Sequence, residues 1–183
     1  MRLKAFTCLL VVLCGFAFAA PSGPSKKIPL PRAVSDSISW FAAREMGGTN
    51  KPFTRVHLEK LAATSDRVAL VYFATWCVPC RAGIKKLVNA REELEKNRVK
   101  VVLVNAGERD ETQIKKMVDG MGGGVFPVIL DPYKRLSEGI GLVGEGKNLA
   151  LPMTLVIDKA GKPLFMLGEE GNDWPSILWT GTR

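Results

Sequence analysis

The chain has 183 residues, of which 46% are hydrophobic and 24% charged, so it has enough apolar side chains to bury a core. This length suits one globular domain with an appendage better than two full domains. The net charge of +8 comes from scattered basic pairs, without interleaved aromatic residues or a nucleic-acid motif. Composition thus argues against collagen-like, coiled-coil, disordered and nucleic-acid-binding proteins.

Residues 1–20 have the order of an export signal. Arg2 and Lys4 form a positive start, Ala5 to Ala20 is an uncharged apolar run, and Ala17 and Ala19 are small residues where a signal peptidase reads. We predict cleavage after Ala19 and a soluble protein that is periplasmic or otherwise exported. If the signal stayed uncleaved, it would anchor the protein in a membrane, although its run of 16 residues is shorter than the roughly 20 that span a bilayer.

The next segment differs in composition from the rest of the chain. Residues 21–35 are rich in Pro, Ser and Gly and predict a flexible linker. Asp36 to Met46 predicts a short helix that ends at Gly47-Gly48. We therefore interpret residues 20–50 as a linker with a short N-terminal helix, and residues 51–183 as the globular domain.

Strand-like and helix-like patterns alternate through the globular domain. Apolar, β-prone runs predict strands at 68–73, 99–104, 125–130, 153–157 and 163–167. Helices are expected at 77–97 and 112–121, in a short stretch after Asp131-Pro132, and after Trp174. The turn at 158–161 joins the last two strands as a hairpin. This order predicts a mixed central sheet with helices on both faces, class α/β.

Two of the four cysteines lie outside the predicted signal. Cys8 and Cys14 would leave with the signal, whereas Cys77 and Cys80 remain with the spacing C-x-x-C. Export would take this pair to a compartment where disulfides form. A disulfide between residues three apart closes too small a loop to stabilise a fold of this size, which makes a structural role the weaker explanation.

A C-x-x-C pair has several possible chemistries. A structural zinc ion needs four ligands, and the mature chain offers these two cysteines and one histidine, His57. Covalent haem attachment needs a histidine directly after the second cysteine, where this chain has Arg81. A redox dithiol is left, with a two-thiol site for a soft metal such as Cu(I) as the alternative. We predict the redox dithiol, with no metal and no cofactor.

The pair falls where a strand gives way to a helix. Cys77 is expected at the helix N-terminus, where free backbone N–H groups and the helix dipole favour a thiolate. Pro79 suits the first helical turn because its missing N–H costs nothing there. Cys80 lies one turn further on and is placed to attack a mixed disulfide on Cys77. We expect Cys77 to be the attacking thiol and Cys80 the more buried, resolving thiol.

Residues 74–81 (Ala-Thr-Trp-Cys-Val-Pro-Cys-Arg) follow an apolar strand and resemble thioredoxin-like proteins of the TlpA/ResA type. Residues 126–132 are similar to the extra strand of that family, and 151–158 to its cis-proline segment. The resemblance implies a thioredoxin fold with an inserted helix–strand unit at about 111–130. It also implies that Pro152 is the cis-proline beside the cysteines. Pro127 is a rival for that role, which we interpret as an edge-strand residue.

The resemblance further implies a substrate surface made of Trp76, Val78, Pro79, Leu151 and Pro152. The implied function is an exported thiol–disulfide oxidoreductase that reduces protein disulfides in the cell envelope, in cytochrome c maturation or copper-site assembly. Its partners would be the substrate proteins and an upstream electron donor. Two alternatives stay open: a disulfide-forming oxidase, and a copper-binding carrier that uses the two thiols.

Two positions depart from the family pattern. Thioredoxins have a buried acid six residues before the first cysteine, where this chain has Val71, and ResA-type proteins have a glutamate three residues after the second, where it has Gly83. Glu108 and Glu169 are candidate substitutes in loops, but we expect water to accept the proton of the resolving cysteine. On that hypothesis, Gly83→Glu would restore an acid and speed turnover.

Overall fold

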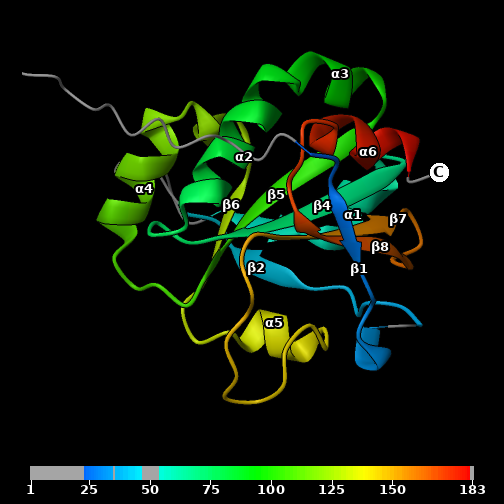
Figure 1. Cartoon of the computed structure of the whole chain (residues 1–183). Coiled ribbons are helices and arrows are strands. Elements are labelled where there is room, and N and C mark those ends of the chain that lie inside the picture. Colours follow the sequence, from blue (N-terminus) through cyan, green and yellow to red (C-terminus); the bar gives the residue numbers. More distant parts are fainter. Residues whose placement is uncertain (1–22, 35, 47–53, 182–183) are drawn as a thin grey trace, which may run out of the picture.

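The computed structural model describes residues 23–34, 36–46 and 54–181. Its centre is a six-stranded mixed sheet with the strand order β1-β8-β7-β4-β5-β6 (Figure 1). The strands are β1 (Lys26–Ile28), β4 (Arg67–Phe73), β5 (Val99–Ala106), β6 (Val128–Asp131), β7 (Met153–Asp158) and β8 (Pro163–Glu169). β5 runs parallel to β4 and β6, whereas β7 is antiparallel to β4 and β8.

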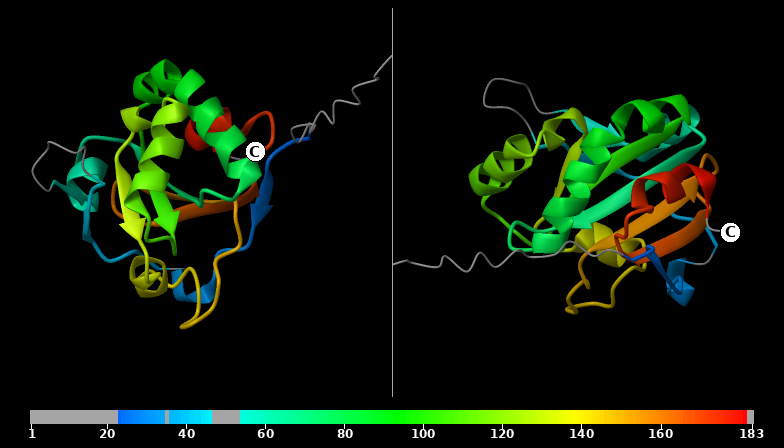
Figure 2. Two further views of the ribbon diagram at one scale, coloured as in Figure 1. Left: turned by 90° about the vertical axis from the view of Figure 1, so that its left-hand side faces the viewer. Right: turned by 45° about the horizontal axis from the view of Figure 1, so that its top comes forward.

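Each face of the sheet is covered by its own layer. One layer holds α2 (Val78–Asn89), α3 (Arg91–Lys96), α4 (Glu111–Gly120) and α6 (Trp174–Thr180). In Figure 2 the red α6 lies beside the green α2 and α3 on the same side of the sheet. The other layer holds β2 (Ala42–Arg44), β3 (Arg55–His57), α1 (Leu58–Ala63) and α5 (Arg135–Gly139). This arrangement confirms the predicted α/β class.

The central strand β4 is buried on both faces. Its side chains alternate, with Ala69, Val71 and Phe73 toward the α2 layer and Val68, Leu70 and Tyr72 toward the other. All six of these residues are at most 2% exposed. A strand covered on both sides needs apolar residues at every position, which is why the sequence shows a continuous run there.

Several predicted elements are confirmed with shifted ends. The inserted helix–strand unit is α4 and β6, the hairpin is β7 and β8, and the helix expected after Trp174 is α6. The helix expected at 77–97 is two helices, because Ala90 between them has φ −94° and ψ 11°, outside the α-helical region. The strand expected at 125–130 begins only at Val128, since Gly123–Val125 form a 3₁₀ turn.

The helix predicted at Asp36 to Met46 is wrong. Ala42–Arg44 form β2, which pairs antiparallel with β3, and in residues 23–34 and 36–41 the one helical turn is the 3₁₀ turn Arg32–Val34. Ile38 donates its N–H to the carbonyl of Gly161 and packs into the core at 4% exposure. These tertiary contacts favour an extended chain over the local helical preference.

The segment predicted as a linker also contributes to the main sheet. Lys26–Ile28 form β1, which pairs antiparallel with β8 at the edge of the sheet (Figure 1). The predicted signal peptide, 1–19, lies outside the described residues. Within the part of the chain that the structure describes, no helix is long and apolar enough to cross a membrane.

Gly171, just after β8, gives a test of how β1 is held. A Cβ on this residue would overlap backbone atoms of Gly23, Pro24 and Ser25. We expect Gly171→Ala to detach this segment and lower the free energy of unfolding by about 1–3 kcal/mol, as overpacking does. Urea unfolding and amide hydrogen exchange of β1 measure both effects.

The matched control is Gly120→Ala, because no atom lies within 4 Å of a Cβ at the end of α4. This change should leave the protein as stable or slightly more so, since alanine restricts the unfolded chain. Equal stabilities of the two variants would contradict the proposed packing of the N-terminal segment.

Candidate active site

The two cysteines lie at the junction of β4 and α2. β4 ends at Phe73, and Cys77 is the N-cap of α2, with Val78 and Pro79 in its first turn. Cys77 and Cys80 form a disulfide with a Cα–Cα distance of 5.3 Å. The helix therefore begins at the disulfide, as the sequence predicts.

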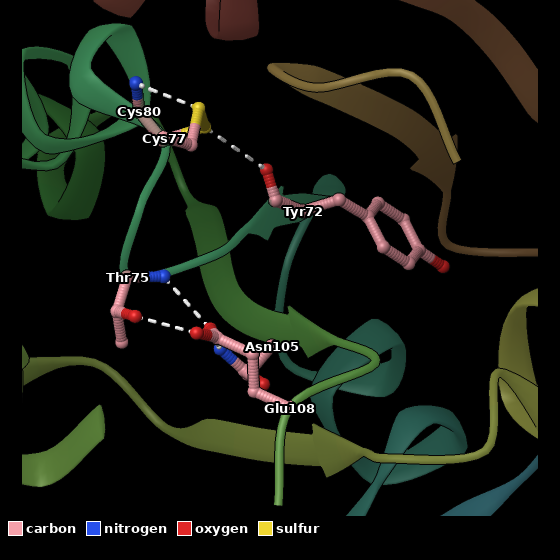
Figure 3. The surroundings of a disulfide bond; sticks show 6 residues. All are labelled: Tyr72, Thr75, Cys77, Cys80, Asn105 and Glu108. Carbon is pink, nitrogen blue, oxygen red and sulfur yellow. Dashed lines mark hydrogen bonds between the residues drawn. A yellow bond between two sulfur atoms is a disulfide. The ribbon is translucent and has the colours of Figure 1, made fainter. Parts of the chain in front are cut away.

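The hydrogen bonds distinguish the two sulfurs. The Cys77 Sγ accepts the backbone N–H of Cys80 at 3.3 Å, whereas the Cys80 Sγ lies 4.0 Å from the carbonyl oxygen of Tyr72 (Figure 3). In the dithiol form, an N–H donor of the first helical turn would stabilise a thiolate on Cys77, and the carbonyl dipole would disfavour one on Cys80. The exposed fraction does not distinguish the two cysteines, because Cys77 is 3% and Cys80 2% exposed in the disulfide form.

Apolar side chains form an exposed rim around the buried disulfide. Trp76 is 66% exposed and Val78 57%, and Pro79 between the cysteines is exposed as well. Leu151 and Pro152 are half-buried. Exposed large apolar side chains beside a reactive bond are typical of a surface that receives another chain.

The register of β7 brings the second proline to this end of the sheet. Met153, the first residue of β7, pairs with Tyr72 near the end of β4, so Pro152 lies where β4 leads into the cysteine loop. The Leu151–Pro152 peptide bond is cis, and no other cis bond occurs in the described residues. Pro127 instead precedes the edge strand β6, and its carbonyl accepts the N–H of Leu103 at 2.9 Å. The interpretation of Pro127 as an edge-strand residue is thus confirmed.

Trp76 and Leu151 also line one cavity of about 330 Å³. Its other walls include Glu108 and the segment 148–149. Of the predicted substrate residues, the structure therefore brings these two together directly. His57, at the end of β3, is the N-cap residue of α1 and belongs to the other layer of the fold.

Glu108 serves the cysteine loop in another way than the sequence suggested. Its carboxylate accepts the backbone N–H of Thr75 at 2.7 Å, the Thr75 hydroxyl at 2.5 Å and the side-chain amide of Asn105 at 2.6 Å (Figure 3). Both oxygens are thus engaged with the loop between β4 and α2 and with the end of β5. These hydrogen bonds hold the cysteine loop in place, so the Glu108 carboxylate has a structural role and is not an unpartnered proton acceptor.

The space beside Gly83 is occupied by a carboxyl group that the sequence analysis missed. An ideal Cβ on Gly83 would overlap Oε2 of Glu170 and lie 2.7 Å from its Cδ. The expectation that Gly83→Glu would simply add an acid is therefore wrong, because the substituted side chain would have to displace Glu170. Val71, the other departure, is 2% exposed and packs in the same core cluster as both cysteines.

The carboxyl group of Glu170 is deeply buried and has no hydrogen-bond partner. The residue is 5% exposed, and neither carboxyl oxygen has a partner. Burial raises its pKa to about 8, against the opposing effect of the Lys86 cation. The Lys86 ammonium donates to the backbone carbonyls of Glu170 and Gly171, at 3.2 and 2.9 Å. No residue pattern marks Glu170 over its neighbour Glu169, the residue considered from sequence, whose side chain the structure does not describe.

No group of three His, Cys, Asp or Glu side chains that could hold a metal ion occurs in the described residues. At the N-terminus of α2, the atoms that could bind a metal ion are the Cys77 and Cys80 sulfurs, which are joined in the disulfide.

The fold and the site together define the class of protein. A mixed sheet, a C-x-x-C disulfide where the central strand leads into a helix, and a cis-proline before the antiparallel neighbour are the features of a thioredoxin fold. Comparison with known families places the chain further: it belongs to the AhpC/TSA family, which matches residues 41–162.

Two curated proteins are similar over about half of this chain. Thiol-disulfide oxidoreductase ResA of Geobacillus thermodenitrificans is 30% identical over 95 residues, which cover 52% of this chain and 50% of the relative. Thioredoxin-like protein YneN of Bacillus subtilis is 27% identical over 101 residues, 54% of each chain. The chain thus spans about half the length of the curated relatives it matches.

Solved structures support the fold. A putative thiol:disulfide interchange protein DsbE from Chlorobium tepidum has a TM-score of 0.58 and 24% identity, over 74% of this chain and 84% of that one. A thioredoxin family protein from Chlorobium tepidum TLS has a TM-score of 0.63 and 20% identity, over 82% and 96%. At these identities the likeness establishes the thioredoxin fold.

The buried carboxyl group should give the stability of the oxidised protein a characteristic pH dependence. Glu170 has a raised pKa of about 8 in the folded protein against 4.5 in the unfolded chain, so unfolding releases a proton between these values and the protein loses stability as pH rises through them. Glu170→Gln removes this loss. We expect the variant to match the wild type at pH 4 and to be the more stable protein at pH 8.5.

Urea unfolding of the oxidised proteins at pH 4, 6 and 8.5 measures the difference. Glu92→Gln, on the exposed surface of α3, is the control and should follow the wild type throughout. A gap between Glu170→Gln and the wild type that is the same at all three pH values would show that Glu170 titrates normally.

Proposed function

We propose that this protein is a thiol–disulfide oxidoreductase that exchanges disulfides with other proteins through Cys77 and Cys80. The observation that carries the proposal is the disulfide at the N-terminus of α2, set in an exposed apolar rim beside the cis-proline. Membership of the AhpC/TSA family and the similarity to the thiol-disulfide oxidoreductase ResA support this activity.

In the proposed reaction the dithiol form begins the exchange. The Cys77 thiolate, stabilised by the N–H of Cys80, attacks one sulfur of a substrate disulfide and releases the other as a thiolate. The Cys80 thiolate then attacks the Cys77 Sγ, which breaks the mixed disulfide and releases the second substrate thiol. Two electrons pass to the substrate, and the product is the Cys77–Cys80 disulfide seen in the structure. A donor dithiol protein would restore the reduced form.

The rim provides the proposed substrate surface. Trp76, Val78 and Pro79 would pack against apolar residues around the substrate disulfide, and backbone groups at Leu151 and Pro152 would pair with an extended substrate segment. The cavity next to Trp76 and Leu151 would take one substrate side chain.

We further infer that the protein works outside the cytoplasm as a reductant of protein disulfides, such as those of cytochrome c maturation or copper-site assembly. The signal-like residues 1–19 and the TlpA/ResA-like motif support this assignment. One structural neighbour is described as a secreted Mycobacterium tuberculosis disulfide oxidoreductase, with a TM-score of 0.53 and 15% identity.

The roles of the two cysteines can be tested by trapping. In the reduced protein, iodoacetamide should label Cys77 first, because the helix N-terminus favours its thiolate. Cys80→Ser should accumulate mixed disulfides with a disulfide peptide, detected by mass spectrometry, whereas Cys77→Ser should capture none. Faster labelling of Cys80, or capture by Cys77→Ser, would reverse the assignment.

The direction of electron flow follows from the reduction potential. The Val78-Pro79 dipeptide adds neither charge nor a side-chain donor near the thiolate, so we expect a value nearer to about −270 mV, as in thioredoxin, than to about −120 mV, as in DsbA. Equilibration with glutathione or dithiothreitol buffers measures it. A potential above roughly −150 mV would instead favour the disulfide-forming oxidase.

A further inference from the structure

The second step of the proposed reaction needs a proton acceptor. Cys80 is 2% exposed in an apolar cluster, and burial of this kind raises the pKa of a thiol and keeps it protonated. Val71 offers no acid from β4, and Gly83 offers none from α2. The carboxylate of Glu108 is already engaged by Thr75 and Asn105.

Glu170 reaches the helix face that carries Cys80. Gly83 follows Cys80 by three residues in α2, and side chains three apart lie on the same face with Cβ atoms about 5–6 Å apart. The Glu170 carboxyl group occupies the place where a Gly83 side chain would begin. It therefore lies about one helical turn from Cys80, on the same face of α2.

We propose that Glu170 accepts the proton of Cys80 in the resolving step. Because Gly83 has no side chain, the surface of α2 has room at this position for the Glu170 carboxyl group, which reaches it from the end of β8. The proposal rests on the oxidoreductase function above. It assigns to this chain a proton acceptor that comes from a different element than the helix of the cysteines.

The surroundings of Glu170 suit a proton acceptor. Both of its carboxyl oxygens are buried without a hydrogen-bond partner, so a lone pair is available to a nearby thiol. The raised pKa, about 8, leaves the group close to the pH at which a base exchanges protons most readily. A carboxyl group buried for packing alone would be costly, because a polar group without a hydrogen-bond partner is destabilising in a core.

The groups that face Glu170 come from three elements. From α2 these are Gly83, whose Cβ position the carboxyl group occupies, and Lys86, whose ammonium donates to the carbonyls of Glu170 and Gly171. From α6, the Trp174 ring lies 3.2 Å from the Cβ position of Gly83 and packs beside the carboxyl group. The N-terminal segment closes the outside, where the Ser25 hydroxyl accepts the N–H of Gly171 at 2.9 Å. Among these groups, Lys86 is therefore the cation that lowers the pKa of Glu170.

The proton balance of the step is simple. The Cys80 thiol gives its proton to the Glu170 carboxylate as the Cys80 sulfur attacks the Cys77 Sγ. The bond between Cys77 and the substrate sulfur breaks, and the substrate leaves as a thiolate. The protonated Glu170 then returns its proton to that thiolate or to water, so no external oxidant or reductant is needed beyond the substrate disulfide.

Stopped-flow mixing of the reduced full-length protein with a disulfide peptide separates the two steps. We expect Glu170→Gln to form the mixed disulfide at the wild-type rate, because that step uses Cys77. Its resolving rate at pH 7 should fall by about 10²-fold, the usual contribution of a positioned base. Across pH 6 to 9, the wild-type resolving rate should level off near the pKa of Glu170, whereas that of Glu170→Gln should keep rising.

A relocated carboxylate provides the rescue. Glu170→Ala vacates the space that a Gly83 side chain needs, so the double variant Gly83→Glu/Glu170→Ala should recover most of the resolving rate. Glu170→Ala alone should stay slow. Glu92→Gln on the exposed face of α3 is the control and should behave as the wild type.

The outcomes separate this inference from the proposed function. If the wild type forms no mixed disulfide at Cys77, the oxidoreductase function itself fails. If both steps occur and Glu170→Gln resolves as fast as the wild type with the same pH profile, Glu170 is not the acceptor. A slow Glu170→Gln that the relocated carboxylate does not rescue, in a variant whose circular dichroism is native, would assign Glu170 a packing role and also overturn the proposal.

Discussion

The position of β4 at the centre of the sheet determines where the chemistry lies. Its parallel pairing with β5 and antiparallel pairing with β7 leave it buried on both faces. The antiparallel register places Met153 opposite Tyr72, so the cis-proline segment begins where β4 ends and the cysteine loop follows. The disulfide, the apolar rim and the proline thus meet at one end of the sheet because two strands of opposite direction share β4.

The same geometry buries the resolving cysteine, and the proton acceptor that we propose for it comes from outside α2. The thiol that would have to ionise in the proposed reaction, that of Cys80, lies between β4 and α2 in an apolar cluster. Gly83 has no side chain on the face of α2 that carries Cys80, and the carboxyl group of Glu170, from the end of β8, fills this space. The segment 23–28 then covers this corner through its contacts with Gly171 and β8. An acid one helical turn from the second cysteine is thereby present, and it comes from the residue that follows β8 rather than from the helix itself.

Glu108 shows that a nearby acid need not be a proton acceptor. Three donors from Thr75 and Asn105 engage its carboxylate, which makes it part of the loop structure. Glu170 differs because burial leaves its oxygens without donors. The contrast between the two carboxylates lies in their hydrogen-bond partners and not in their distance along the chain from the cysteines.

The sequence predicted the α/β fold and the cysteine junction, because buried strands and a C-x-x-C motif leave local patterns. The cis-proline was implied by the resemblance to the TlpA/ResA type, since Pro127 also precedes a strand and the local pattern does not distinguish the two prolines. It did not predict β1 and β2, since the segments 26–28 and 42–44 become strands through partners more than ten residues away. Glu170 was missed for the same reason. Its role depends on an absent side chain at Gly83, 87 positions earlier in the sequence, and no local pattern connects the two.

The most direct test of the account is an NMR titration of the reduced protein with ¹³C-labelled glutamate carboxyls and cysteine Cβ atoms. We expect one carboxyl group, absent from Glu170→Gln, to titrate near pH 8 and to be coupled to the Cys80 signal, so that each group shows two steps. In Glu170→Gln, Cys80 should titrate in a single step. A Glu170 carboxyl that ionises at its ordinary pKa of 4.5, with a Cys80 curve that Glu170→Gln does not change, would contradict the account.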